Sequence, residues 1–250
     1  MPVVTPIDEE AWNRFQLIVK PEQSGKTFVM IKKIIDDLVD PTPGKTVINF
    51  ICCDNSLLLT KQTSQRINDD LSEYIFNGET YVEFSSKKDA KRDKAAVWMA
   101  ITGPSQIKNV ICCTNGKRVS DISSIIRDFN ASPFVSNQFE FKIWLDEADK
   151  FTGFISKTFR PLVDEFENVR VNCLTATPEP LFKKYQYMNV LPLEETTHPE
   201  YHGWKDNNRV ILENPHGTTV GFINHVLSNV VSPLKGTRWF IPADHKKTTH

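Results

Sequence analysis

Two adjacent carboxylates follow a hydrophobic segment near the middle of the chain. Residues 141–145 are Phe-Lys-Ile-Trp-Leu, Asp146 and Glu147 come directly after them, and Asp149 follows two positions later. An apolar run that ends in charge is typical of a buried strand whose carboxyl end borders a ligand-binding crevice. Nucleotide hydrolysis uses such a pair, because one carboxylate holds Mg²⁺ while its neighbour orients or deprotonates the attacking water. Acidic clusters also occur in exposed turns, so the interpretation depends on the rest of the chain.

A second polar motif lies between a predicted strand, residues 14–20, and a predicted helix, residues 28–39, whose apolar residues recur at helical spacing. Strand, loop with Gly-Lys-Thr, and helix is the context that a phosphate-binding loop requires. Backbone N–H groups of such a loop cradle the β-phosphate, the lysine reaches the β/γ oxygens, and the threonine hydroxyl binds Mg²⁺. The predicted nucleotide-binding residues are Gln23, Ser24, Gly25, Lys26 and Thr27.

This loop departs from the usual motif. Lys20 occupies the position of the first glycine, and Gly25 is the one glycine that remains. A second Gly-Lys-Thr, within residues 43–46, precedes an apolar strand and therefore lacks the required context. The tripeptide alone is weak evidence, and its place between a strand and a helix is what supports a nucleotide site.

Further apolar segments alternate with helical ones, and polar residues follow each of them. Alternation of this kind predicts an α/β fold, a doubly wound and mostly parallel sheet with helices on both faces. The carboxyl ends of parallel strands meet at one edge, so the polar motifs are expected to share that edge. The predicted strands are residues 46–53, 81–84, 108–114 and 169–174, in addition to those at 14–20 and 141–145.

Taken in order, these motifs resemble the first RecA-like domain of superfamily 2 helicases, the P-loop NTPases that include the DEAD-box proteins. The resemblance covers roughly residues 15–178. Its motifs are Ser24-Gly-Lys-Thr27, Asp54-Asn-Ser56, Thr114-Asn-Gly-Lys-Arg118, Asp146-Glu-Ala-Asp149 and Thr175-Ala-Thr177.

The resemblance implies a role for each matched residue. Lys26 would bind the β/γ-phosphates of ATP, Thr27 and Asp146 would hold Mg²⁺, and Glu147 would position the hydrolytic water. Asp149 would contact the turn of Thr175 and Thr177 and couple the nucleotide state to domain closure. A single strand or duplex of DNA or RNA would lie against Asn55, Ser56, Thr114, Asn115, Gly116 and Arg118, through contacts that position a strand without reading its sequence.

The same resemblance predicts the domain organisation. Residues 1–200 would form the ATP-binding RecA-like domain, residues 201–236 an irregular excursion plus a helix, and residues 237–250 the first strand of a second RecA-like domain. The chain has none of the second-domain motifs, including the arginine finger, so we expect one half of a two-domain enzyme that turns ATP over slowly by itself.

Composition sets limits on other functions. The chain has 250 residues with a net charge of −1, so any contact with nucleic acid must be local. The apolar runs are strand-sized and the N-terminus lacks the pattern of a signal peptide, so we expect no membrane span. The cysteines (Cys52, Cys53, Cys112, Cys113 and Cys173) are odd in number and lie in apolar runs, which favours buried thiols over disulfides or a zinc site and indicates a reducing compartment, the cytoplasm or nucleus. The divergent motifs would also suit a viral protein.

Two alternatives to an ATP-driven helicase remain. A degenerate P-loop module would hold nucleic acid or a protein without hydrolysis, and the altered loop around Lys20 favours it. A switch GTPase or small-molecule kinase would need an Asn-Lys-x-Asp motif or an arginine-rich lid, and the sequence has neither.

Overall fold

The computed structural model describes residues 13–20, 24–41, 43–75, 79–84, 93–103, 107–132, 136–184 and 189–190. The chain divides into two compact units, Met1–Tyr201 and His202–His250, and all described residues belong to the first. The predicted excursion at 201–236 and the predicted strand at 237–250 lie outside the described residues.

A seven-stranded sheet forms the centre of the first unit, in the order β3-β4-β2-β5-β6-β1-β7. Every strand pairing among the described residues is parallel. The central strands are rich in β-branched and aromatic residues, which suit a sheet buried on both faces. The strands are β1 (Phe15–Val19), β2 (Thr46–Cys53), β3 (Val82–Glu83), β4 (Asn109–Cys113), β5 (Phe139–Asp146), β6 (Val169–Thr175) and β7 (Asn189–Val190).

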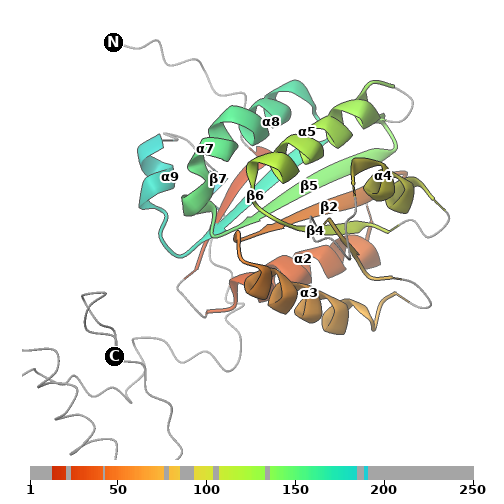
Figure 1. Cartoon of the computed structure of the whole chain (residues 1–250), viewed down its shortest axis with the longest axis horizontal. Helices are drawn as coiled ribbons and strands as arrows, with labels where there is room; N and C mark the ends of the chain where they lie inside the picture. Colours follow the sequence, from red (N-terminus) through yellow and green to blue (C-terminus); the bar gives the residue numbers. More distant parts are fainter. Residues whose placement is uncertain are drawn as a thin grey trace, which may run out of the picture. The chain divides into compact units, whose positions relative to one another are not determined.

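Helices cover both faces of the sheet (Figure 1). On one face lie α2 (Lys26–Val39) and α3 (Leu57–Leu71), which pack on one cluster of apolar side chains. The other face is covered by α4 (Lys94–Thr102), α5 (Gly116–Asn130) and α8 (Arg160–Glu165), which share a second cluster. The remaining helical segments are η1 (Ala148–Phe151), α7 (Thr152–Phe154), η2 (Ile155–Phe159) and α9 (Glu179–Lys184).

The alternation of side chains along each strand divides the core between the two faces. In β2, Phe50 and Cys52 join the cluster under α4, α5 and α8, whereas Ile51 and Cys53 join the cluster under α2 and α3. Successive residues of a strand point to opposite faces, so an unbroken apolar run is what a strand covered on both sides requires. The prediction of an α/β fold, a doubly wound parallel sheet with helices on both faces, is confirmed.

A buried amide network ties the neighbouring strands together on the face covered by α2 and α3. Trp144 Nε1 donates to Asn49 Oδ1 at 3.0 Å, and Asn49 Nδ2 donates to Asn109 Oδ1 at 3.0 Å. Asn109 Nδ2 then donates to the carbonyl oxygen of Thr80 at 2.9 Å. These side chains are all buried, and the network crosses β5, β2 and β4 to Thr80, two residues before β3. It therefore fixes side by side the strands whose ends carry Asp146, Asp54 and Thr114.

The helical segment between β5 and β6 is irregular. It contains a π-helical turn, Ile155–Phe159, in which the N–H of Arg160 bonds to the carbonyl of Ile155. Pro161 follows at the start of α8 and has no N–H to donate, so the wider turn accommodates it. Short elements after Thr177, α9 and β7, were not predicted. No helix among the described residues is both long and apolar enough to cross a bilayer.

Candidate nucleotide site

The polar motifs meet at the carboxyl edge of the sheet, and the strand order arranges them in a row. Along this edge β5 ends at Asp146 and β6 at Thr175, while β4, β2 and β1 are followed directly by Thr114, Asp54 and Lys20. The acidic strand β5 therefore lies between the predicted strand-binding ends of β2 and β4 and the predicted phosphate loop after β1. The sheet thus brings the two predicted ligand sites onto one edge, with Asp146 and Glu147 between them.

The predicted phosphate-loop residues lead into α2, which begins at Lys26. Gly25 precedes the helix in a left-handed conformation, with φ of 91°, and its carbonyl accepts the first helical bond, from Val29 N at 3.0 Å. Lys26 and Thr27 form the first turn, which has no capping side chain and no acidic residue. A helix start with this composition fits an anion, because the helix dipole and the first N–H groups both favour negative charge there. Gln23 lies outside the described residues.

Lys26 contacts the acidic motif directly. Its Nζ lies 3.2 Å from Glu147 Oε1, and the two side chains are 9% and 29% exposed. Glu147 has φ of 53° and is the one described non-glycine residue with positive φ. A glutamate in the left-handed region is uncommon and costs conformational energy, and such residues cluster at functional sites. The turn at Glu147 separates β5 from η1 and presents the carboxylate to the lysine.

Asp146 ends β5 in a poorly solvated position. Burial raises the pKa of this carboxyl, the neighbouring Glu147 raises it further, and the Lys26 ammonium opposes both. The carboxylate accepts a bond from the N–H of Glu147 at 3.1 Å. A nearby cation would relieve this accumulation of negative charge, which is the electrostatic setting expected of a Mg²⁺ ligand.

Asp149 contacts the end of β6, as the resemblance implied. Thr175 Oγ1 donates to Asp149 Oδ1 at 2.6 Å and accepts from the N–H of Thr177 at 3.0 Å. Thr175 is fully buried, so this small network has little competition from water. It joins the segment after β5 to the turn after β6, whereas a role in domain closure stays a prediction.

Lys20 continues the ladder beyond β1. Its N–H donates to the carbonyl of Thr175 at 3.1 Å, and its side chain is 4% exposed. Burial lowers the pKa of the Lys20 ammonium. A lysine therefore replaces the usual glycine at a position where the backbone is extended and paired with β6, and a side chain fits there without a positive φ.

The end of β2 leaves polar groups at the surface. Asn55 is exposed, and its N–H donates to Asp54 Oδ1 at 2.7 Å. Ser56 is half-buried and directly precedes α3, and its carbonyl accepts from Thr60 N at 2.9 Å. Their predicted contact with nucleic acid stays a prediction, with Asn55 the better exposed of the two.

The residues at the end of β4 have structural partners. Thr114 Oγ1 donates to the carbonyl of Cys53 at 2.6 Å, and Asn115 Oδ1 caps α5 by accepting from Arg118 N at 3.1 Å, with Gly116 as the first helical residue. Arg118 is 2% exposed, pairs with Asp121 at 3.0 Å and lies over the ring of Phe84. Little of Thr114 or Arg118 is open to a bound strand, so their predicted contacts stay untested.

Sequence reasoning missed an ion pair between these motifs. Lys150 Nζ, in η1, lies 2.8 Å from Asp54 Oδ2, at the end of β2. The hydrogen bond from Lys150 lowers the pKa of Asp54, and the same bond raises the pKa of Lys150. The two residues are 96 positions apart, and only the adjacency of β2 and β5 reveals the contact.

The cysteines are all free thiols, and Cys113 is half-buried while the others are buried. Cys52 and Cys112 face each other on β2 and β4 with their sulfurs 3.9 Å apart. Among the residues that the structure describes, no group of three or more His, Cys, Asp or Glu side chains could hold a metal ion. The interpretation of buried thiols is confirmed for Cys52, Cys53, Cys112 and Cys173, whereas Cys113 is half-buried.

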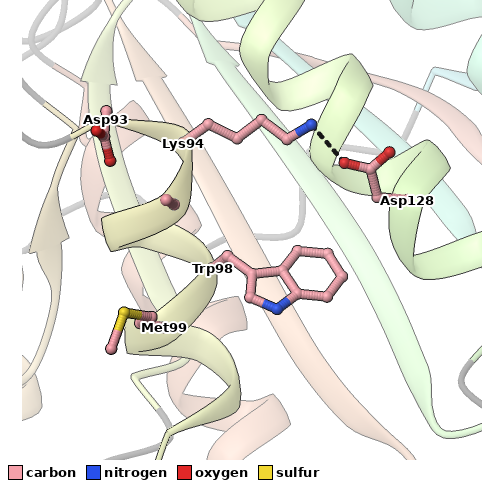
Figure 2. A pocket seen from close by; sticks show the side chains of 6 residues that line it. Asp93, Lys94, Trp98, Met99 and Asp128 are labelled. Atoms are coloured by element: carbon pink, nitrogen blue, oxygen red, sulfur yellow. Dashed lines mark ion pairs between the residues drawn. The ribbon is translucent and has the colours of Figure 1, made fainter.

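A separate cavity of about 530 Å³ lies beside α4 and the end of α5 (Figure 2). Trp98 and Met99 form its apolar wall, and the ion pair between Lys94 and Asp128 borders it. Because α5 starts at the carboxyl edge and runs back along the sheet, Asp128 lies about 18 Å from that edge. The cavity contains none of the predicted site residues.

Comparison with known proteins adds little to this description. No known protein-family model matches the chain, and no curated protein matches it. Among solved structures 56 chains match, and one is described as the structure of the Aeropyrum pernix ORC2 protein in ADPNP-ADP complexes. It is 13% identical with a TM-score of 0.28, and the alignment covers 69% of this chain and 48% of that one. The chain thus spans about half the length of that protein, and a TM-score this low supports no inference about function.

Proposed function

We propose that this chain is the ATP-binding half of a nucleic-acid-dependent ATPase, a helicase or translocase that couples ATP hydrolysis to movement along or separation of strands. The observation that carries the proposal is the ion pair between Lys26 and Glu147, 3.2 Å apart at the uncapped start of α2 and beside Asp146. These residue types at one sheet edge, contributed by β5 and by the helix after β1, match what phosphoryl transfer to water requires.

The chain's own residues divide the work of binding and hydrolysis. The first turn of α2 would receive the β-phosphate, and Lys26 would exchange Glu147 for the β/γ oxygens. Glu147, released from Lys26, would orient the attacking water and accept its proton. Thr27 and Asp146 are the oxygen ligands that would hold Mg²⁺, which supplies charge neutralisation on the phosphates when bound. One or two protein ligands suffice for Mg²⁺ at a nucleotide, since phosphates and water complete its shell.

The ends of the neighbouring strands would respond to whether ATP or ADP is bound. Asp149 follows Glu147 by two residues and holds Thr175 at 2.6 Å, so a movement of the acidic turn reaches the end of β6. The ends of β2 and β4 would hold the backbone of a strand, with Asn55 the most accessible candidate. A second RecA-like domain would supply the arginine that stabilises transition-state charge.

Calorimetric titration of Mg-ADP and of a non-hydrolysable Mg-ATP analogue tests the proposal. Lys26→Ala removes the phosphate-binding cation, and Lys32→Ala is a matched control, because Lys32 is an exposed lysine on the same helix. Binding that Lys26→Ala alone abolishes supports a phosphate loop. A strand-stimulated release of phosphate, lost in Glu147→Gln, would extend the result to hydrolysis.

The degenerate P-loop module is the second candidate, favoured by one observation. Lys20 stands where the loop usually has glycine, and its buried side chain lies next to the site. This reading predicts that the folded chain binds nucleic acid or a protein and does not bind Mg-nucleotide. The titration therefore separates the two functions.

A further inference from the structure

The pair of Lys150 and Asp54 lies where the two proposed ligand sites meet. Lys150 Nζ donates to Asp54 Oδ2 at 2.8 Å, and the side chains are 50% and 23% exposed. Glu147 and Asp149 lie close enough to stabilise the Lys150 ammonium as well. An ion pair as exposed as this contributes little to the free energy of unfolding, so its placement needs another explanation.

Hydrogen bonds and ion pairs run without a break from the surface turn at Asn55 to Lys26. The N–H of Asn55 donates to Asp54 Oδ1 at 2.7 Å, and Asp54 Oδ2 accepts from Lys150. The N–H of Lys150 donates to the carbonyl of Glu147 at 3.0 Å, and Glu147 Oε1 lies 3.2 Å from Lys26 Nζ. Lys150 and Glu147 thus belong to one tight turn, and a displacement of Lys150 moves the residue that pairs with Lys26.

We propose that Lys150 and Asp54 are positioning residues that couple the strand site to the nucleotide site. The proposal rests on the proposed function and concerns the regulation of that same site. A phosphodiester group bound beside Asn55 competes with Asp54 for Lys150, whose ammonium is half-exposed. When Lys150 transfers to the phosphate, the turn that holds Glu147 shifts and Lys26 becomes available to the nucleotide. Strand and nucleotide then strengthen each other's binding by the same factor.

The test is the affinity of a non-hydrolysable Mg-ATP analogue with and without saturating oligothymidylate or oligouridylate. In the wild type we expect the oligonucleotide to tighten analogue binding at least about fivefold. In Lys150→Ala and in Asp54→Asn the factor falls below about twofold, while binding of the analogue alone stays within about twofold of wild type. Lys157→Ala is the matched control, because Lys157 is exposed and on the following helical segment, and it keeps the full factor.

Two further variants separate coupling from simple contact. Asp54→Asn retains Lys150 and should bind the oligonucleotide at least as tightly as the wild type, even though coupling is lost. The charge exchange, Asp54→Lys with Lys150→Asp, should restore part of the coupling that each single change removes, which a purely structural role does not predict.

The outcomes are distinguishable. If the folded wild type binds no Mg-nucleotide, the proposed function fails and this inference with it. If the wild type binds both ligands without mutual strengthening, or if Lys150→Ala keeps the full factor, the inference is overturned and the nucleotide site stands. Coupling by one of the two oligonucleotides alone supports the inference and shows which of the two strands the site accepts.

Discussion

The buried amide network predicts how much stability is lost when one of its asparagines is replaced. The size of the loss follows from the number of buried polar groups left without a hydrogen-bond partner. Replacing Asn49 by leucine, which fills a similar volume, leaves Trp144 Nε1 and Asn109 Oδ1 without partners. Replacing Asn109 by leucine leaves Asn49 Nδ2 and the carbonyl of Thr80 without partners. An unsatisfied buried group costs about 1–3 kcal/mol, so each single variant loses about 2–6 kcal/mol.

The double variant distinguishes a network from independent contacts. With both asparagines replaced, Trp144 Nε1 and the Thr80 carbonyl again lack partners, so the loss is also about 2–6 kcal/mol and not the sum of the single losses. Because a domain unfolds with about 5–15 kcal/mol, the single variants should remain measurable in urea.

Urea unfolding followed by circular dichroism is the assay, with the midpoint read at constant slope. Asn130→Ala is the control, since the Asn130 side chain is half-buried and bonds locally to the carbonyl of Ile126, and it should cost less than about 1 kcal/mol. If the loss of stability in the double variant equals the sum of the two single losses within about 0.5 kcal/mol, the network is refuted. Single losses below about 1 kcal/mol would contradict the burial of these groups.

Three further predictions concern the site. Glu147→Gln should bind Mg-ATP at least as tightly as wild type, because Lys26 loses a competing partner, while single-turnover phosphate release falls about 10²–10⁴-fold; unchanged release would remove Glu147 from catalysis. The pKa of Asp146 in the folded chain lies above its ordinary value of 3.8. At a pH between these two pKa values, the folded chain keeps a proton on Asp146 that the unfolded chain has released. The contribution of Asp146 to the free energy of unfolding therefore falls as pH rises through that interval. Asp146→Asn should therefore unfold at higher urea than wild type at neutral pH without nucleotide, with the advantage shrinking towards acid, whereas an equal midpoint at all pH values would contradict the raised pKa. Thr175→Val removes the hydrogen bonds to Asp149 and to the N–H of Thr177, and its urea midpoint should fall by an amount equivalent to about 1–3 kcal/mol. An unchanged midpoint would show that these hydrogen bonds do not stabilise the fold.

The fold was predictable because local patterns were strong. Apolar runs such as residues 46–53 and the amphipathic stripe of α2 identify strands and helices without tertiary information. The π turn before Pro161 was not predictable, because a proline inside a helical pattern predicts a break and not the kind of turn that absorbs it. The order of strands depends on non-local pairing, which the pattern of one chain does not encode.

The candidate site was predictable in its residue types and less so in its contacts. The contact of Asp149 with Thr175 was expected from the resemblance, whereas the pairing of Lys26 with Glu147 was not predicted. The burial of Arg118 was not expected either, because the ring of Phe84 comes near it only when α5 packs on the sheet.

The proposed function requires a phosphate-binding site at the start of α2. The most direct measurement is the dissociation constant of a non-hydrolysable Mg-ATP analogue for the wild type, Lys26→Ala and Lys32→Ala. Loss of one charge-assisted bond, at about 1.5–3 kcal/mol, predicts that Lys26→Ala binds roughly 10- to 150-fold more weakly and that Lys32→Ala matches the wild type. Equal affinity of all three proteins, or no binding by a folded wild type, would contradict a phosphate-binding site at the start of α2.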